Sequence, residues 1–403
     1  MKSNFKQRKI YRSLGGPFLL LLWVTVNASP ASARSRSTWT ATWAAPMVRN
    51  NSAATFQDQT LRQIVHTSIG GTGARVRLSN LFGDGPLVVK DVHLALRAGD
   101  SAIVTASDRV VTFSGKQSVV IPVGETIASD RVPFNVPKFA DVAISMYLPE
   151  KTAASSHHAT SHQTSYTASG DVSGSERMEE AKISRSVYFL CGLDVIGHPY
   201  RGTVVALGAS ITEGYGTTAE NHDLWTDELA RRLSDAGLEI GVVNLGISGN
   251  RLLKAGAGDS AESRFQRDVL AQPGVRWVIF SDEPINDLGS SKPAPDLDTI
   301  TAALERMIAL AHAKHIRFLC STLTPFQGAN YWVEQQEQTR EQYNAFIRTS
   351  GSHCDGIIDQ DAATHDPAHP TRFLPAYDHG DHLHPNDAGH LAIADAVPLG
   401  YFR

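Results

Sequence analysis

Serine, histidine and aspartate occur in this chain at positions that suit nucleophilic catalysis. Ser210 lies in Gly208-Ala-Ser-Ile-Thr-Glu-Gly214, directly after the apolar run Val204-Val-Ala-Leu207. A serine hydroxyl needs a base to take its proton, and an imidazole is suited to this because its pKa lies near neutrality. His384 could be that base, and Asp381, three residues earlier, could hold the imidazole in the required tautomer. The three residues predict a serine nucleophile served by an Asp–His pair.

Two further segments could stabilise the negative charge that forms when such a serine attacks an ester. Gly249, in Asn244-Leu-Gly-Ile-Ser-Gly-Asn250, has no Cβ, so its N–H can approach a ligand closely. Asn286, in the segment that begins at Ser281, could offer a side-chain amide to the same point. Together with the N–H of Ser210, these groups are the predicted oxyanion hole.

Three other interpretations remain open at this stage. Ser210-Ile-Thr-Glu213 is also a capping-box pattern, so the serine could merely begin a helix. Asp387-Ala-Gly-His390 repeats the Asp-x-x-His spacing, although its histidine falls inside a predicted helix. The cluster Asp378–His384 could bind a metal ion in a metal-dependent hydrolase, since histidines and carboxylates are common ligands.

The catalytic candidates follow strands of a predicted α/β domain over residues 200–403. Apolar strands alternate there with helical patterns, which predicts a parallel sheet covered on both faces. The expected strands are 204–207, 241–245, 277–280, 317–321 and 356–359, and the expected helices are 224–233, 297–313, 334–347 and 388–396. In such folds the site lies at the carboxyl ends of the strands, so Ser210, Gly249 and Asn286 should meet at one sheet edge.

The preceding residues, 38–195, predict an all-β sandwich domain. Short alternating strands are expected at 60–68, 74–79, 88–96, 109–113, 117–122 and 140–148. Gly70-Gly-Thr-Gly73 should close a hairpin between the first two of them. The segment 155–174, rich in serine, histidine and threonine, is expected to be a long solvated loop.

The first 33 residues have the pattern of a cleaved secretory signal peptide. A basic start containing Lys2 and Arg12 precedes the apolar run 17–26 and the small residues Ala31-Ser-Ala33. We therefore expect a secreted or periplasmic protein without stable membrane insertion. In such a compartment Cys320 and Cys354 are the more plausible disulfide pair, although free buried thiols are an equal alternative. The formal net charge of −4, without a basic stripe, argues against nucleic acid as a partner.

The four segments, in this order, resemble the SGNH (GDSL-like) hydrolase family. The resemblance covers roughly residues 200–403 and implies a flavodoxin-like sheet of strand order 2-1-3-4-5. It implies Ser210 as nucleophile, His384 as base and acid, Asp381 as its orienting residue, and Ser210, Gly249 and Asn286 as the oxyanion hole. Ala209 and Pro284 depart from the family pattern, which has aspartate and glycine there. The first departure should weaken the bracing of the serine segment, and the second should reshape the acyl pocket.

The N-terminal half looks similar to the β-domain of secreted bacterial members that act in xylan-degrading settings. This similarity implies an exported serine esterase that could deacetylate a plant or other polysaccharide. The reaction would need no metal and no organic cofactor. A non-catalytic carbohydrate-binding protein is the alternative. The acyl length, the alcohol, hydrolysis as against acyl transfer, and the oligomeric state stay open.

Overall fold

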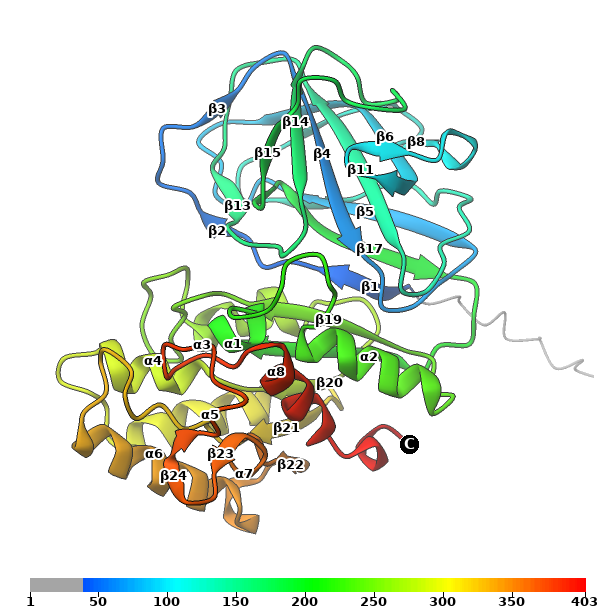
Figure 1. The fold of residues 1–403 in the computed structure, drawn as a ribbon. Coiled ribbons are helices and arrows are strands. Elements are labelled where there is room, and N and C mark those ends of the chain that lie inside the picture. Colours follow the sequence, from blue (N-terminus) through cyan, green and yellow to red (C-terminus); the bar gives the residue numbers. More distant parts are fainter. Residues whose placement is uncertain (1–38) are drawn as a thin grey trace, which may run out of the picture. The chain divides into compact units, whose positions relative to one another are not determined.

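A computed structural model describes residues 39–403, and the predicted signal peptide lies outside these described residues. They belong to one unit, in which a strand-rich region, residues 39–196, precedes an α/β region, residues 202–403 (Figure 1). The division into domains over 38–195 and 200–403 stays a prediction. Within residues 39–403, no helix combines the length and the apolar character that crossing a membrane requires.

Two antiparallel sheets make up most of the strand-rich region. The first has the order β1 (Thr40–Ala44), β17 (Leu190–Ile196), β5 (Gly73–Ser79) and β10 (Thr126–Ala128). The second has the order β15 (Lys182–Ser184), β14 (Ser165–Ser169), β4 (Gln59–His66), β11 (Asp141–Leu148), β6 (Leu87–Gly99) and β7 (Ala102–Ile103), and both β8 (Arg109–Val111) and β9 (Ser118–Ile121) also pair with β6. Short pairings add β2 (Val48–Arg49), β13 (Ser156–His158), β16 (Val187–Tyr188), β3 (Thr55–Phe56) and β12 (Thr152–Ala153). Alternate side chains of both large sheets, among them Val65 and Val76, share one buried apolar cluster. The prediction of a strand-rich N-terminal half is confirmed.

Two local predictions in this region are wrong. The segment Gly70–Gly73 does not close a hairpin, because β4 and β5 lie in different sheets and direct their apolar side chains into the shared cluster. A Cβ at Gly70 would lie 2.5 Å from the carbonyl oxygen of Val136, so glycine serves a close approach between chain segments there. The segment 155–174 contains β13 and β14, and its His158 is buried. This segment lacks the alternating apolar pattern by which strands are predicted, because the polar side chains of its strands face another part of the same protein.

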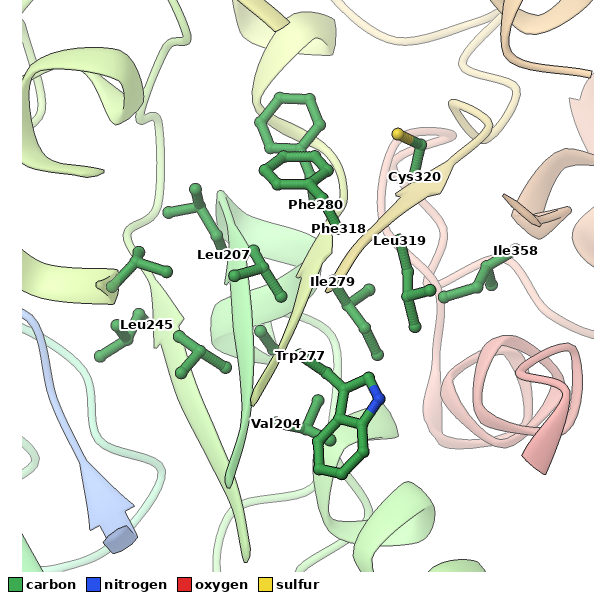
Figure 2. Packing of buried hydrophobic residues seen from close by; sticks show 14 of the residues in the cluster. Val204, Leu207, Leu245, Trp277, Ile279, Phe280, Phe318, Leu319, Cys320 and Ile358 are labelled. Carbon is green, nitrogen blue, oxygen red and sulfur yellow. The ribbon is translucent and has the colours of Figure 1, made fainter. Parts of the chain in front are cut away.

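The α/β region is built on a five-stranded parallel sheet. Its order is β19 (Ile240–Gly246), β18 (Gly202–Gly208), β20 (Val275–Phe280), β21 (Arg317–Ser321) and β22 (Gly356–Ile358), which confirms the predicted order 2-1-3-4-5. Side chains such as Val204, Leu207, Leu245 and Ile279 pack in the core of this sheet (Figure 2). Strands buried on both faces need apolar residues at nearly every position, which explains their short continuous apolar runs.

Helices follow most strands of this sheet. They are α1 (Ser210–Glu213), α2 (Trp225–Asp235), α3 (Ala261–Arg264), α4 (Glu283–Ser290), α5 (Leu297–His312), α6 (Glu334–Ile347), α7 (Gln360–Thr364) and α8 (Asp387–Asp395), and a small hairpin of β23 (His365–Asp366) and β24 (His369–Phe373) precedes α8. The side chain of Asn386 accepts a hydrogen bond from the N–H of Gly389 at 3.1 Å and caps α8, as its residue type predicts.

The strand-rich region covers the outer edge of the parallel sheet at β19. The N–H of Val242 donates to the hydroxyl of Ser68 at 3.0 Å. A Cβ at Gly241 would lie only 2.2 Å from the carbonyl oxygen of Ala41, so β1 passes directly against this strand. Ala41 and Ala44 of β1 also belong to the apolar core of the α/β region. An edge strand left open exposes unpaired backbone groups, and here a neighbouring part of the chain covers it.

The cysteine pairing is now settled. Cys320, in β21, forms a disulfide with Cys354, just before β22, at a sequence separation of 34. Cys191 is free and buried, and burial raises the pKa of its thiol to about 11.

Candidate active site

Ser210 is the first residue of α1 and lies at the carboxyl end of β18, which is the first strand of the parallel sheet in chain order. Two residues before it, the backbone of Gly208 lies against the Thr212 side chain, so closely that a Cβ there would be 1.9 Å from the hydroxyl oxygen. Ser210 is mostly buried, with 9% of its surface exposed. The structure therefore places the hydroxyl at the strand end, as predicted.

Asp381, His384 and Ser210 form a continuous chain of hydrogen bonds. Nε2 of His384 lies 2.8 Å from Oγ of Ser210, and Nδ1 of His384 lies 2.6 Å from Oδ2 of Asp381. A carboxylate accepts only, so Nδ1 carries the proton and Nε2 presents a lone pair to the serine hydroxyl. The structure brings together all three residues that the sequence singled out, although 174 residues separate Ser210 from His384.

The turn that contains Asp381 also fixes its charge. Oδ1 of Asp381 accepts the N–H groups of Leu383 and His384 at 3.1 and 2.9 Å. Burial by itself would raise the pKa of Asp381, but these hydrogen bonds and the one from the His384 ring outweigh it and lower the pKa. The carboxylate is therefore charged at neutral pH and can stabilise a protonated His384.

Asp282, which the sequence interpretation left without a role, braces the serine segment. Its Oδ1 accepts the N–H of Ala209 at 3.0 Å and the hydroxyl of Thr212 at 2.6 Å, and its Oδ2 accepts the N–H of Ile211 at 2.9 Å. A carboxylate that follows β20 thus braces the segment in which Ala209 supplies none, and whether the alanine weakens this bracing stays a prediction. The signal in the sequence was an acidic residue directly after a buried strand.

The N–H groups on either side of Ser210 are thus occupied, while its own is not. Among the described residues, no hydrogen-bond partner is recorded for the N–H of Ser210 or for that of Gly249. Gly249 has φ of 76°, a backbone conformation that favours glycine. Both N–H groups are thus free of partners among residues 39–403, and their role in an oxyanion hole stays a prediction.

The amide of Asn286 is oriented from two sides. Its Nδ2 donates to the carbonyl of Asn250 at 2.9 Å, and its Oδ1 lies 3.4 Å from the hydroxyl of Tyr331. The second N–H of this amide has no recorded partner within residues 39–403. The neighbouring Asp287 accepts the N–H groups of Leu252 and Leu253 at 2.6 and 3.1 Å. The segments that carry Gly249 and Asn286 are therefore tied to each other.

Pro284 occupies the first turn of α4, where the backbone N–H groups have no partner within the helix. The proline therefore costs the helix no hydrogen bond. That it reshapes the acyl pocket stays a prediction.

Glu213 is a second site residue that sequence reasoning missed. It lies on α1 with Ser210, and its buried carboxyl accepts a hydrogen bond from the hydroxyl of Ser248, the residue before Gly249. Burial raises the pKa of Glu213 to about 7. Nε2 of His158 lies 3.5 Å away, but burial lowers the pKa of His158 to about 3, so the pair is not ionic at neutral pH. Glu213 links the helix of the nucleophile to the glycine of the oxyanion hole.

The competing interpretations find less support in the geometry. His390 lies within α8, fully buried, and its ring nitrogens face the N–H of Trp225 and the carbonyl of Tyr215, both at 3.3 Å.

In the cluster 378–384, Nδ1 of His382 pairs with Asp378 at 2.6 Å, while Asp381 is hydrogen-bonded to His384. Within residues 39–403, no three side chains of this cluster bring ligand atoms within 4.8 Å of one another. The metal-dependent alternative therefore lacks a converging set of ligands.

Comparison with known proteins identifies the α/β region. Residues 206–392 match the GDSL-like Lipase/Acylhydrolase family. A comparison with curated proteins finds no match. Among solved structures, an acetylxylan esterase from Geobacillus stearothermophilus is similar at 22% identity, with a TM-score of 0.39 and coverage of 50% of this chain and 94% of that one. A GDSL-like lipase from Bacteroides thetaiotaomicron is similar at 18% identity, with a TM-score of 0.39 and coverage of 50% and 88%. Residues 206–392 therefore carry a GDSL-like lipase/acylhydrolase domain, and the protein is a serine hydrolase that acts on ester bonds.

Proposed function

We propose that this protein is an exported esterase that cleaves carboxylic esters through an acyl-enzyme on Ser210, and that its substrate is an acetylated polysaccharide. The observation that carries the mechanism is the hydrogen-bonded chain from Asp381 through His384 to the Ser210 hydroxyl, with donor–acceptor distances of 2.6 and 2.8 Å. These are distances at which a proton can pass in the reaction.

In the proposed reaction, His384 takes the proton of Ser210 as its oxygen attacks the ester carbonyl. Asp381 stabilises the imidazolium that results. The N–H groups of Ser210 and Gly249 and the amide of Asn286 stabilise the oxyanion. His384 then gives its proton to the leaving alcohol, and water, activated by the same imidazole, releases the acid from the acyl-enzyme.

The exposure of the site supports a large alcohol component. Tyr215 lies against the ring of His384 with 4.2 Å between ring centroids, and 47% of its surface is exposed. The leaving group departs on the side of the histidine, so a bulky alcohol such as a sugar chain can extend past this ring into solvent. An aromatic face combined with a phenol hydroxyl suits contact with a sugar. In this proposal the two large sheets of the strand-rich region form a sandwich that buttresses the site.

The Cys320–Cys354 disulfide supports export, because disulfides persist in oxidising compartments outside the cytosol. The basic and apolar pattern of the first 33 residues supports it independently. Secretion and the polysaccharide substrate are proposals that rest on these features.

Labelling with a fluorophosphonate, followed by mass spectrometry of the peptides, tests the nucleophile. We expect one adduct on Ser210 and neither labelling nor turnover in Ser210→Ala. Ser234→Ala, which removes a surface hydroxyl that contacts Lys138, is the matched control and should behave as the original protein. An adduct elsewhere, or turnover retained in Ser210→Ala, would disprove the mechanism.

The substrate is tested separately with acetylated xylan, other acetylated glycans and p-nitrophenyl esters of increasing chain length. Hydrolysis of the glycan acetyl esters, followed as acetate release, should exceed hydrolysis of the longer synthetic esters, followed as p-nitrophenol release. A preference for long acyl chains would refute the polysaccharide and leave the mechanism intact.

A further inference from the structure

Three side chains from separate segments meet where the strand-rich region borders the loop before α2. His66 ends β4, and Asp141 begins β11 directly opposite it in the antiparallel ladder. His222 comes from the loop between α1 and α2. Nδ1 of His66 lies 2.8 Å from Oδ1 of Asp141, and Nε2 of His222 lies 3.5 Å from the same oxygen. The three ligand atoms all lie within 4.8 Å of one another, the only such group within residues 39–403.

Neighbouring groups hold the three side chains close together. Nη1 of Arg97 donates to Oδ2 of Asp141 at 3.1 Å, which leaves Oδ1 to face the two imidazoles. The rings of His66 and His222 stack with 3.6 Å between centroids and 17° between planes, so the binding of one ion would require the two rings to tilt apart until their lone pairs converge. The amide of Gln163 lies 3.1 Å from Nδ1 of His222 and directs Nε2 toward Asp141.

Turning over the side-chain amide of Gln163 gives the contact that a metal-bound histidine requires. The side-chain oxygen of Gln163 is buried and has no partner among residues 39–403. With the amide turned over, that oxygen accepts the Nδ1 proton of His222, and Nε2 is left as a lone pair. A histidine ligand almost always donates its second N–H to an oxygen in this way.

The loop that carries His222 is fastened to the strand-rich region just before this residue. Glu220, two residues before His222, pairs with Nη2 of Arg97 at 3.2 Å and accepts the N–H of Thr164 at 3.0 Å. The same arginine thus orients Asp141 and holds the His222 loop. The segments that carry the three side chains are therefore held together before any ion binds.

We propose that His66, Asp141 and His222 bind one zinc ion that joins the strand-rich region to the α/β region. Two imidazole nitrogens and one carboxylate oxygen are a common zinc ligand set, with bonds of about 2.0–2.2 Å. A tetrahedral ion with such bonds places its ligand atoms about 3.3 Å apart, and the separations of 2.8 and 3.5 Å lie on either side of that value. The side chains are 12–21% exposed, so the ion can enter and water can complete its shell. This site is distinct from the Ser210 site and does not depend on the proposed substrate.

Calorimetric titration of the full-length, tag-free protein with zinc chloride, after removal of metal with EDTA, tests the site. We expect one equivalent of zinc per chain, and visible absorption bands when cobalt replaces zinc. Zinc should also raise the midpoint of thermal unfolding by a few degrees, because an ion that binds only the folded state stabilises it. The absence of a one-equivalent binding step in the unaltered protein would overturn the proposal without reference to any variant.

The variants His222→Ala and His66→Ala should lose the one-equivalent step and the rise in the unfolding midpoint. His93→Ala is the matched control, because Nδ1 of His93 pairs with Asp108 at 2.9 Å and this pair belongs to no three-residue group within the described chain. It should bind zinc as the original protein does. If His66→Ala proves unstable, His222→Ala, which alters only a loop residue, decides the question. Stoichiometric binding that survives His222→Ala would assign the zinc to another site and refute ours.

Discussion

Removal of the Asp282 carboxylate should damage both stability and catalysis, because this one side chain holds the backbone on either side of the nucleophile. Asp282→Ala deletes the acceptor of two buried N–H groups, those of Ala209 and Ile211, and of the Thr212 hydroxyl. A buried donor left without a partner costs about 1–3 kcal/mol. Two unpaired amides should lower the free energy of unfolding by about 2–6 kcal/mol.

The catalytic effect follows from the position of Ser210 between those two amides. A shift of this turn by about 1 Å is enough to lengthen the contact between Ser210 and His384, and misplacement of that size costs about 10²-fold in rate. We expect kcat for p-nitrophenyl acetate to fall by about this factor in Asp282→Ala. Asp282→Asn should also be impaired, because each carboxylate oxygen accepts an N–H, so the new amide nitrogen faces a donor in either orientation.

Urea unfolding followed by tryptophan fluorescence and steady-state kinetics would measure the two effects. Asp296→Ala is the control, since Asp296 also accepts a backbone N–H, that of Thr299 at the start of α5, far along the chain from Ser210. It should lower the unfolding midpoint slightly and leave kcat unchanged. If Asp282→Ala retained full kcat, or lost no more stability than the control, the bracing role assigned to Asp282 would be refuted.

Three further changes have outcomes that the structure determines. Asn286→Ala should lower kcat by about 10²–10³-fold with a small change in KM, because an oxyanion donor acts mainly in the transition state; a rise in KM alone would contradict this. Burial raises the pKa of Glu213 from 4.5 to about 7, so the folded state holds a proton that the unfolded chain releases, and stability should fall as pH rises through this window. Glu213→Gln should remove a decline of about 3 kcal/mol, measured by urea unfolding between pH 4.5 and 8; identical pH profiles would show that the carboxyl titrates normally. Replacing Cys320 and Cys354 together by alanine should lower the free energy of unfolding by about 3–4 kcal/mol, given a closed loop of 34 residues, and reduced wild-type protein should show the same loss.

Sequence alone predicted the parallel sheet and its strand order because buried strands and amphipathic helices have distinct hydrophobic periods. It also selected Ser210, Asp381 and His384, since the turn carrying Asp381 and His384 is local and strand ends of a parallel sheet meet at one edge. Asp282 and Glu213 were missed for a common reason. Their roles arise from hydrogen bonds to segments far away in the chain, and no local spacing encodes such a contact.

The N-terminal half was harder to predict from sequence, because its strand pairing also depends on contacts between segments that are distant in the chain. The strand pairing of β4 depends on which sheet its apolar face joins, and the glycines at 70–73 suggested a local hairpin instead. The polar segment that contains His158 gave no apolar period, because its side chains pack against other polar groups of the protein.

The position of β1 limits how this protein can be divided. Although β1 opens the described chain, Ala41 and Ala44 belong to the apolar core of the α/β region, and the Ala41 carbonyl lies against Gly241 of β19. A recombinant fragment beginning near residue 200 would therefore carry every proposed catalytic group. It would nevertheless expose the unpaired backbone groups at the outer edge of β19, which can pair with another chain. Such a fragment should self-associate when expressed, and a fusion partner attached at that point would not replace the missing strand. Any engineered variant with exchanged modules needs to keep β1 with the catalytic half.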